Sequence, residues 1–179
     1  MMTEIELLDL VSEWEDTLRY YVGLDVGEIL SVEVSPHARQ WLGRCRYIET
    51  DSGKLCHLQF AKALLSLPKT YIVNTVVHEM CHAVNGTRGH DQAWKRACQD
   101  VMDFYPELHL DIYATREEAK AFRKALPPHV VYRATCQGCG HVYTAYKKTR
   151  FVKACLAGDT QHYHCACGSD KFDIEVGRE

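Results

Sequence analysis

The stretch VVHEMCHAVNGTRGHDQAW, residues 76–94, contains three histidines and one glutamate at spacings typical of a metal site. On an α-helix, residues i and i+4 share one face, so His78 and His82 can reach the same ion. Glu79 projects beside that ion, where a carboxylate can accept a proton from water. A glycine-containing turn then presents His90 as a third ligand. The stretch therefore predicts a zinc site that leaves its fourth position to water.

The histidine spacing also decides the local fold of the segment KTYIVNTVVHEMCHAVNG. Its β-branched residues would favour a strand on propensity alone. The i, i+4 histidines and a run of about 16 residues before Gly86 favour a buried helix instead. Cys81 lies on another face of this helix and is expected in the core. Trp94 follows His90 by one turn and is expected to pack beneath it.

The segments on either side predict further helices and a small sheet. Thr3 and Glu6 have capping-box spacing and open an N-terminal helix. The segment ILSVEVS alternates as a strand, and residues 40–61 read as two strands joined by a turn at Thr50–Gly53. Downstream we expect a helix at Asp91–Phe104 and a further helix that is capped by Thr115 and stopped by the proline pair Pro127–Pro128.

Charge divides the chain into two parts. The net charge of the 179 residues is −3, but residues 1–60 carry eleven acids and five bases, whereas residues 119–158 carry eight bases and no acid. Such asymmetry indicates a basic module attached to an acidic one. With the proline pair as the boundary, the expected domains are residues 1–128 and residues 129–179.

Hydropathy and cysteine use indicate the compartment. No apolar run approaches the roughly 20 residues of a membrane span. The N-terminal segment MMTEIELLDLVSEWEDTL is acidic and amphipathic, unlike a signal peptide. We therefore expect a monomeric cytoplasmic protein with no membrane partner, associated with the nucleoid, or nuclear in a eukaryote. In a reducing compartment the nine cysteines are not expected to form disulfides.

Four clustered cysteines near the C-terminus indicate a structural zinc, because so small a segment can build little core of its own. Cys136 and Cys139 form a C-x-x-C knuckle, but Cys165 and Cys167 are only one residue apart. Either all four cysteines bind, or His164 replaces Cys165 and restores the usual spacing. The gap of 25 residues between the knuckles implies an insertion. Two weaker ligand candidates lie nearby: Cys155 and His162.

The block HEMCHAVNG followed by GHDQAW resembles the SprT-like zincin family, to which Spartan proteins belong. The shared features are H-E-x-x-H, a third histidine after a short loop, and a tryptophan soon after it. The upstream order of a helix, a strand, a G-R-C-like strand, an L-x-F strand and the metal helix is similar as well. So is a C-terminal zinc ribbon, although the C-x-C of this chain departs from the family's usual C-x-x-C.

This resemblance implies an α+β fold. The first part is expected to be a small zincin-like metalloprotease domain with helices packed on a short mixed or antiparallel sheet. The second is expected to be a zinc-ribbon-like β subdomain. By the same resemblance, catalytic zinc is bound by His78, His82 and His90, and Glu79 is the general base.

Basic and aromatic side chains interleave around the cysteine knuckles. Amines can neutralise phosphates, and aromatic faces can stack on unpaired bases. Nothing resembles a helix that reads the major groove, so sequence-independent binding is expected. A solvated basic face would explain the same charges, but the resemblance to DNA-dependent proteases favours single-stranded or distorted DNA. The candidate contacts are Arg133, Tyr143, Tyr146, Lys147, Lys148, Arg150, Phe151 and Lys153.

The leading hypothesis is a DNA-dependent zinc endopeptidase that cleaves DNA-bound or DNA-crosslinked proteins, with one catalytic and one structural zinc. Such an enzyme would act in DNA–protein crosslink repair. The alternatives are a zinc peptidase without nucleic-acid dependence and a non-catalytic nucleic-acid-binding zinc protein, which would have no use for Glu79. Three side chains are conceivable stabilisers of the oxyanion, and the sequence does not choose among them: Arg88, His109 and Tyr113.

Overall fold

The computed structural model describes residues 1–128 and 130–178. The chain divides into two compact units, unit 1 at Met1–Leu126 and unit 2 at Pro127–Glu179. The division falls beside the proline pair. His129, with which the expected second domain begins, lies outside the described residues, as does Glu179. Within the described ranges, no helix combines the length and the apolar character that crossing a membrane requires.

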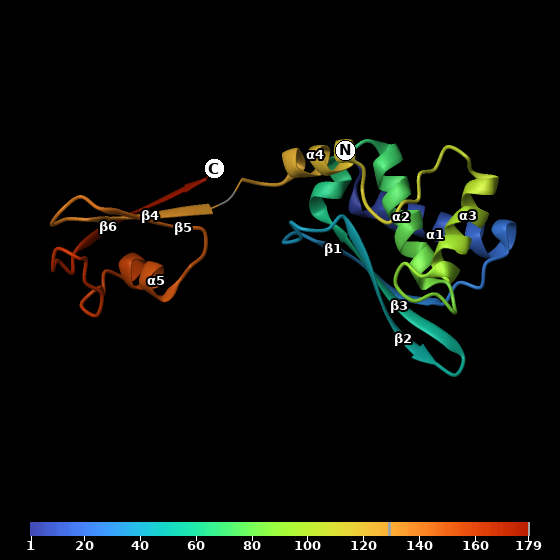
Figure 1. Cartoon of the computed structure of the whole chain (residues 1–179), viewed down its shortest axis with the longest axis horizontal. Helices are drawn as coiled ribbons and strands as arrows, with labels where there is room; N and C mark the ends of the chain where they lie inside the picture. The colour runs from blue at the N-terminus through green and yellow to red at the C-terminus, as the bar shows by residue number, and fades with distance from the viewer. Residues whose placement is uncertain (129, 179) are drawn as a thin grey trace. The chain divides into compact units, whose positions relative to one another are not determined.

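Unit 1 combines helices with a three-stranded mixed sheet (Figure 1). The strand order is β1–β3–β2, in which β1 runs parallel and β2 antiparallel to the central strand β3. This agrees with the predicted α+β class and short mixed sheet. The elements in chain order are α1 (Glu4–Asp16), the π-helical turn η1 (Thr17–Val22), β1 (Glu28–Ser35), β2 (Gly43–Thr50), β3 (Gly53–Ala61), the 3₁₀ helix η2 (Lys62–Ser66), α2 (Lys69–Ala83), α3 (Gln92–Phe104) and α4 (Arg116–Ala125).

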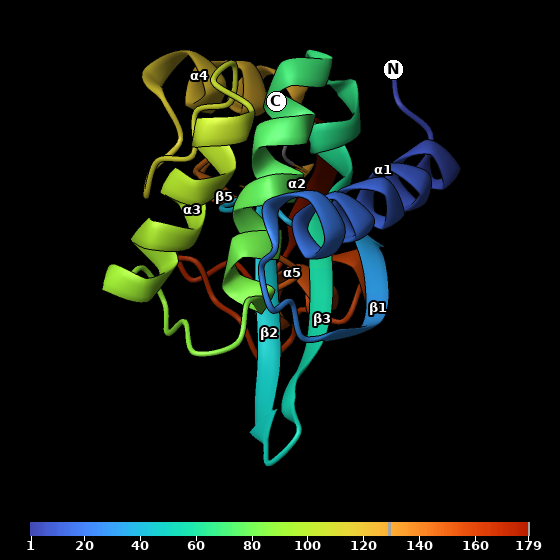
Figure 2. The same ribbon diagram turned by 90° about the vertical axis from the view of Figure 1, so that its right-hand side faces the viewer.

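Helices α1 and α2 lie over the same face of this sheet (Figure 2). Alternate side chains of a strand point to opposite faces, and β3 buries Cys56, Leu58 and Phe60 on the helical side. The predicted capping box begins α1: the Glu6 backbone N–H donates to Thr3 Oγ1, and the Thr3 N–H donates to the Glu6 carboxylate.

Helix α2 forms despite its β-branched residues. Ile72, Val76 and Val77 are almost completely buried, so tertiary packing outweighs the strand propensity of these side chains. The helix begins after Pro68 and ends at Ala83, because Val84 adopts an extended backbone conformation. The end comes slightly before the expected Gly86, and it leaves a longer turn between α2 and α3.

Unit 2 is an antiparallel sheet with one helix. The strand order is β5–β4–β6, and helix α5 fills the predicted insertion between the cysteine knuckles. Thr149 caps α5 by accepting a hydrogen bond from the Val152 N–H, and Gly158, at a φ of 71°, ends it. Val152 and Cys155 of this helix are buried. The elements are β4 (Val130–Cys136), β5 (Val142–Ala145), α5 (Arg150–Ala157) and β6 (Phe172–Arg178).

Candidate active site

Three histidine side chains converge in unit 1. His78 and His82 lie one turn apart on α2, and His90 lies in the turn before α3. The three potential ligand atoms lie within 4.8 Å of one another. His78 Nε2 is 3.3 Å from His82 Nε2 and 3.2 Å from His90 Nε2. Tetrahedral nitrogen ligands of zinc lie about 3.4 Å apart, so these spacings fit a zinc ligand set.

Backbone carbonyls hold two of the rings from behind. The Asp111 carbonyl accepts a hydrogen bond from His78, and the Gly89 carbonyl accepts one from His82. The Nε2 atoms of His78, His82 and His90 point toward one another. A ring that donates to a carbonyl through Nδ1–H keeps its Nε2 lone pair available to a cation, as is usual for metal-bound histidines.

The protonation states of the three rings also suit metal binding. Burial lowers the pKa of His78 to about 4, and the charge of His90 adds to the effect. Burial lowers the pKa of His82 to about 3, together with the charges of the other two histidines. The pKa of His90 is lowered mainly by burial. The rings are therefore neutral at pH 7, the form that binds zinc, and this donor set fits zinc.

Trp94 packs against all three histidine rings. The ring centroids are 4.9 Å apart for His78, 5.2 Å for His82 and 4.5 Å for His90. The Asp91 carboxylate, which caps α3, accepts a 2.8 Å hydrogen bond from the backbone N–H of Trp94 and so fixes the start of the helix. The prediction that Trp94 packs beneath His90 is confirmed. The predicted core position of Cys81 is confirmed as well, because this residue is completely buried.

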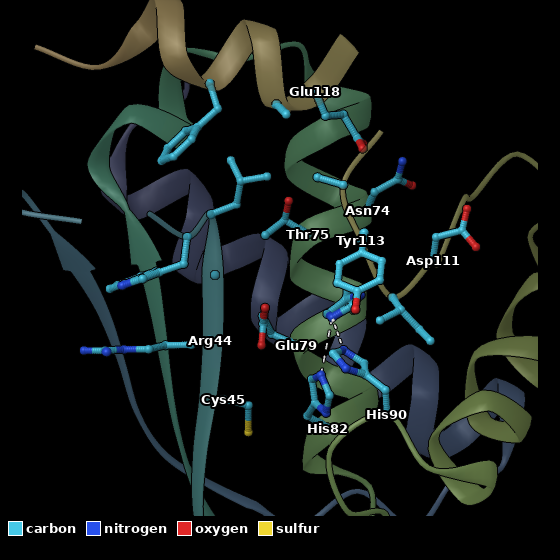
Figure 3. A pocket seen from close by; sticks show the side chains of 18 of the residues that line it. Arg44, Cys45, Asn74, Thr75, Glu79, His82, His90, Asp111, Tyr113 and Glu118 are labelled. Carbon is cyan, nitrogen blue, oxygen red and sulfur yellow. Dashed lines mark hydrogen bonds between the residues drawn. The ribbon is translucent and has the colours of Figure 1, made fainter. Parts of the chain in front are cut away.

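Glu79 lies beside the histidines on the wall of the same cleft (Figure 3). Burial raises the pKa of its carboxyl to about 8, although the Cys45 backbone N–H donates to it and works in the opposite direction. A carboxyl with a pKa near neutrality can both accept and return a proton. Gly43 on β2 allows this arrangement, because a Cβ there would lie 2.7 Å from Glu79 Cγ. The sequence alone did not reveal this role of Gly43.

The cleft has a volume of about 760 Å³ and runs between β2, α2, the segment before α4, and α4 itself. Two of the three candidate oxyanion stabilisers line it, His109 and Tyr113. The Arg88 guanidinium is instead bound to Glu49, at 3.0 Å between Nη2 and Oε2. Figure 3 shows the Tyr113 ring directed into the cleft toward the histidines. The geometry therefore favours Tyr113.

Four thiols converge in unit 2, within 4.8 Å of one another. The sulfur atoms of Cys136 and Cys167 are 3.5 Å apart, and so are those of Cys139 and Cys165. Thiolate ligands of a tetrahedral zinc lie about 3.8 Å apart, so the shortened C-x-C knuckle brings both of its cysteines to one site. His164 is exposed and does not belong to this group.

Tyr143 supports the thiol cluster. Its hydroxyl donates to Cys165 Sγ at 3.2 Å. The pKa of Cys165 is lowered to about 6, first by the Cys167 backbone N–H and then by this hydroxyl. The thiolate, which is the form that binds metal, is therefore favoured at pH 7. Tyr143 thus has a structural role that its prediction as a DNA contact did not include.

The remaining candidate DNA contacts differ in exposure. Phe151 packs in an aromatic cluster with Tyr143, Tyr163 and Phe172, and Arg133 lies directly opposite Glu175 of β6. Tyr146 is 61% exposed. Four bases are exposed: Lys147, Lys148, Arg150 and Lys153.

Three histidines beside a buried carboxyl in an open cleft have the arrangement of a zinc metallopeptidase. The chain belongs to the SprT-like family, whose model matches residues 13–114, more than half of its length. This confirms the resemblance seen in the sequence and assigns a metallopeptidase-like function. The matched range contains the sheet, the three histidines and Glu79, whereas unit 2 lies outside it. Comparisons with curated proteins and with solved structures gave no match.

Proposed function

We propose that this chain is a zinc endopeptidase that cleaves proteins bound or crosslinked to DNA, and that it acts in DNA–protein crosslink repair. The observation that carries the peptidase assignment is the convergence of His78, His82 and His90 beside Glu79 in one cleft. The DNA assignment is supported by the exposed bases of unit 2. The proposal includes one catalytic zinc at the histidines, one structural zinc at the thiols, and a monomer located with DNA in the nucleoid or nucleus.

The catalytic chemistry follows from the positions of Glu79 and Tyr113. When bound, zinc supplies a Lewis acid that polarises a carbonyl and acidifies water. Glu79 takes a proton from the attacking water and delivers it to the leaving amine. A cation held by the three neutral histidines would favour the carboxylate form of Glu79, which is the form that accepts this proton. The Tyr113 hydroxyl would donate a hydrogen bond to the developing oxyanion.

The substrate would bind along β2, an edge strand of its sheet. The Cys45 N–H faces Glu79 rather than β3, so alternate residues Gly43, Cys45 and Tyr47 present backbone groups to the cleft. An extended peptide can pair with such an edge through its own backbone. Recognition by backbone requires an extended segment and tolerates many side chains, which suits a peptidase for diverse DNA-bound proteins.

Unit 2 would supply the DNA contacts. Lys147, Lys148, Arg150 and Lys153 are exposed within the acid-free residues 119–158, and amines of this kind neutralise phosphates irrespective of sequence. Tyr146, with its exposed ring, is the predicted aromatic residue best placed to stack on an unpaired base. Single-stranded or distorted DNA is therefore the proposed ligand.

A zinc peptidase without DNA dependence is the second candidate. One observation favours it: the side chains of Tyr143 and Phe151 have partners within unit 2, and Arg133 lies opposite Glu175 of β6. If the basic residues only keep this unit soluble, unit 2 is a structural module held together by zinc.

Cleavage of a DNA-binding protein by the full-length chain separates these functions. We expect the wild type to cleave when single-stranded or nicked DNA is added. The Glu79→Gln variant should keep the wild-type zinc content but lose at least about a hundredfold in rate, because it has no proton acceptor. Normal cleavage by this variant would exclude the mechanism. Equal wild-type cleavage with and without DNA, with no salt-sensitive DNA binding, would favour the second candidate.

A further inference from the structure

Lys54 of β3 is a charged side chain buried behind the metal site, with only 3% of its surface exposed. Its ammonium donates to the His82 carbonyl at 2.8 Å, to the Thr87 carbonyl at 2.7 Å and to Thr87 Oγ1 at 2.7 Å. All three N–H donors of the ammonium are therefore used. Its Nζ also lies 4.0 Å from the centroid of the Tyr47 ring.

One acceptor belongs to His82, the second histidine ligand, at the end of α2, and the other two belong to Thr87 in the turn that leads to His90. Gly86 and Gly89 in this turn have positive φ values of 80° and 55°, which allow the chain to reverse but add no stiffness. Thr87, only 1% exposed, donates its hydroxyl to the Val84 carbonyl at 2.8 Å. The Lys54 ammonium adds two contacts to this turn from outside its own sequence.

A helix cap does not by itself account for a buried ammonium. Lysine near a helix C-terminus is favourable because it opposes the helix dipole, but an exposed side chain or a glycine would serve that purpose. Burial of a charge is costly unless it is fully hydrogen-bonded. Lys54 satisfies this requirement by bridging the carbonyl of one histidine ligand and the turn that carries another.

We propose that Lys54 is a positioning residue for the metal site: its ammonium holds the turn carrying His90 against the end of α2 that carries His82. Lys54 is not among the residues that line the cleft, so it acts through the histidines. The inference rests on the proposed zinc site at His78, His82 and His90.

The same hairpin contacts the turn at a second, exposed point. Glu49 of β2 pairs directly opposite Lys54 and binds the Arg88 guanidinium, with exposed fractions of 75% for Arg88 and 47% for Glu49. Exposed ion pairs of this kind contribute little. Glu49→Gln is therefore a matched control. It removes a charge from the same hairpin, at a side chain that contacts the same turn.

The test is the zinc content of the full-length chain after equilibration with buffers of graded free zinc. Lys54→Met keeps the length of the side chain and removes its donors, and Thr87→Val keeps the shape of Thr87 and removes its hydroxyl. Each should weaken zinc binding at the histidines by about tenfold to a hundredfold, as is typical when a group that orients a ligand is removed. Glu49→Gln should bind as the wild type does. Thiol reactivity should show that the unit 2 zinc is unchanged in every variant.

Stability in excess chelator separates positioning from a general structural role. The three tryptophans all lie in unit 1, so their fluorescence reports its unfolding alone. Wild-type zinc affinity in Lys54→Met, even with lower stability in chelator, would overturn the inference. If Lys54→Met does not fold, wild-type affinity in Thr87→Val would overturn it. A wild-type chain that holds zinc only at its thiols would instead overturn the histidine site itself.

Discussion

At the scale of single residues, Glu79 has an environment that disfavours its charge in the metal-free chain. Its pKa is ordinarily 4.5 and is raised to about 8 by burial. A group whose pKa is higher in the folded than in the unfolded state stabilises the folded state fully only at pH values below its pKa in the unfolded state. This stabilisation is lost as the pH rises through its pKa in the folded state. In excess chelator, unit 1 of the wild type should therefore lose stability relative to Glu79→Gln between about pH 4.5 and about pH 8.

Denaturant unfolding of both proteins in chelator, followed by tryptophan fluorescence, measures this difference. The histidines are common to both proteins, so their titration cancels to first order. The free-energy gap should grow across the window to on the order of a few kcal/mol and stay constant above it. A gap that does not change with pH would contradict the raised pKa.

The convergence of the candidate site residues could be predicted from the sequence, because one helical repeat holds His78, Glu79 and His82 together and one short turn adds His90. The supporting residues could not be predicted in this way. Lys54 contacts Thr87 across 33 positions of the chain, and Gly43 meets Glu79 only after β2 packs beside α2. No local spacing encodes such contacts, since they depend on the tertiary fold.

At the scale of elements, the closeness of β2 to α2 controls the cleft. A Cβ at Gly43 would lie 2.7 Å from Glu79 Cγ and 2.9 Å from Thr75 Cγ2, so Gly43→Ala has to push Glu79 or the strand aside. We expect kcat to fall by up to about a hundredfold, because displacements of about 1 Å at a catalytic group have effects of that size. The zinc content should remain that of the wild type, since none of the three atoms nearest to this Cβ belongs to a histidine.

Gly177→Ala in β6 is the matched control. A Cβ there would meet only the Arg133 guanidinium, at 3.5 Å, so turnover should be unchanged. Steady-state kinetics and metal analysis of both variants check the prediction. Full activity in Gly43→Ala would show that the catalytic carboxyl tolerates displacement, whereas loss of zinc would show that the effect extends to the ligands.

Prediction of the elements failed mainly at α5. The charged and aromatic residues of RFVKACLA suggested a binding surface, and no helix was expected there. Signals for a helix were nevertheless present: Thr149 is a favourable N-cap, Gly158 a favourable stop, and Val152 and Cys155 have helical spacing. Helix α2 shows the opposite case: its histidine spacing predicted a helix although its β-branched residues favour a strand, and the helix is present.

At the scale of the whole molecule, the average charge conceals two different units. Unit 2 has seven Lys and Arg and five Asp and Glu, a formal net charge of +2 within a chain of −3, which leaves −5 for unit 1. By net charge alone, DNA would repel the acidic unit 1 and attract unit 2. If DNA recruits the peptidase, the attraction therefore has to come from unit 2.

The salt dependence of DNA binding by the full-length chain tests this division of roles. Replacing Lys147 and Lys148 together by alanine should reduce the slope of log K against log salt by about 0.7 for each phosphate of single-stranded DNA that is no longer neutralised. DNA-stimulated cleavage should fall in parallel while the zinc content stays constant. Replacing Lys62 and Lys69, two exposed lysines of unit 1, removes the same charge and should leave the slope unchanged. An equal reduction of the slope in both double variants would mean that DNA binding depends on the net charge of the chain alone. Unit 2 would then contain no specific contact surface for DNA.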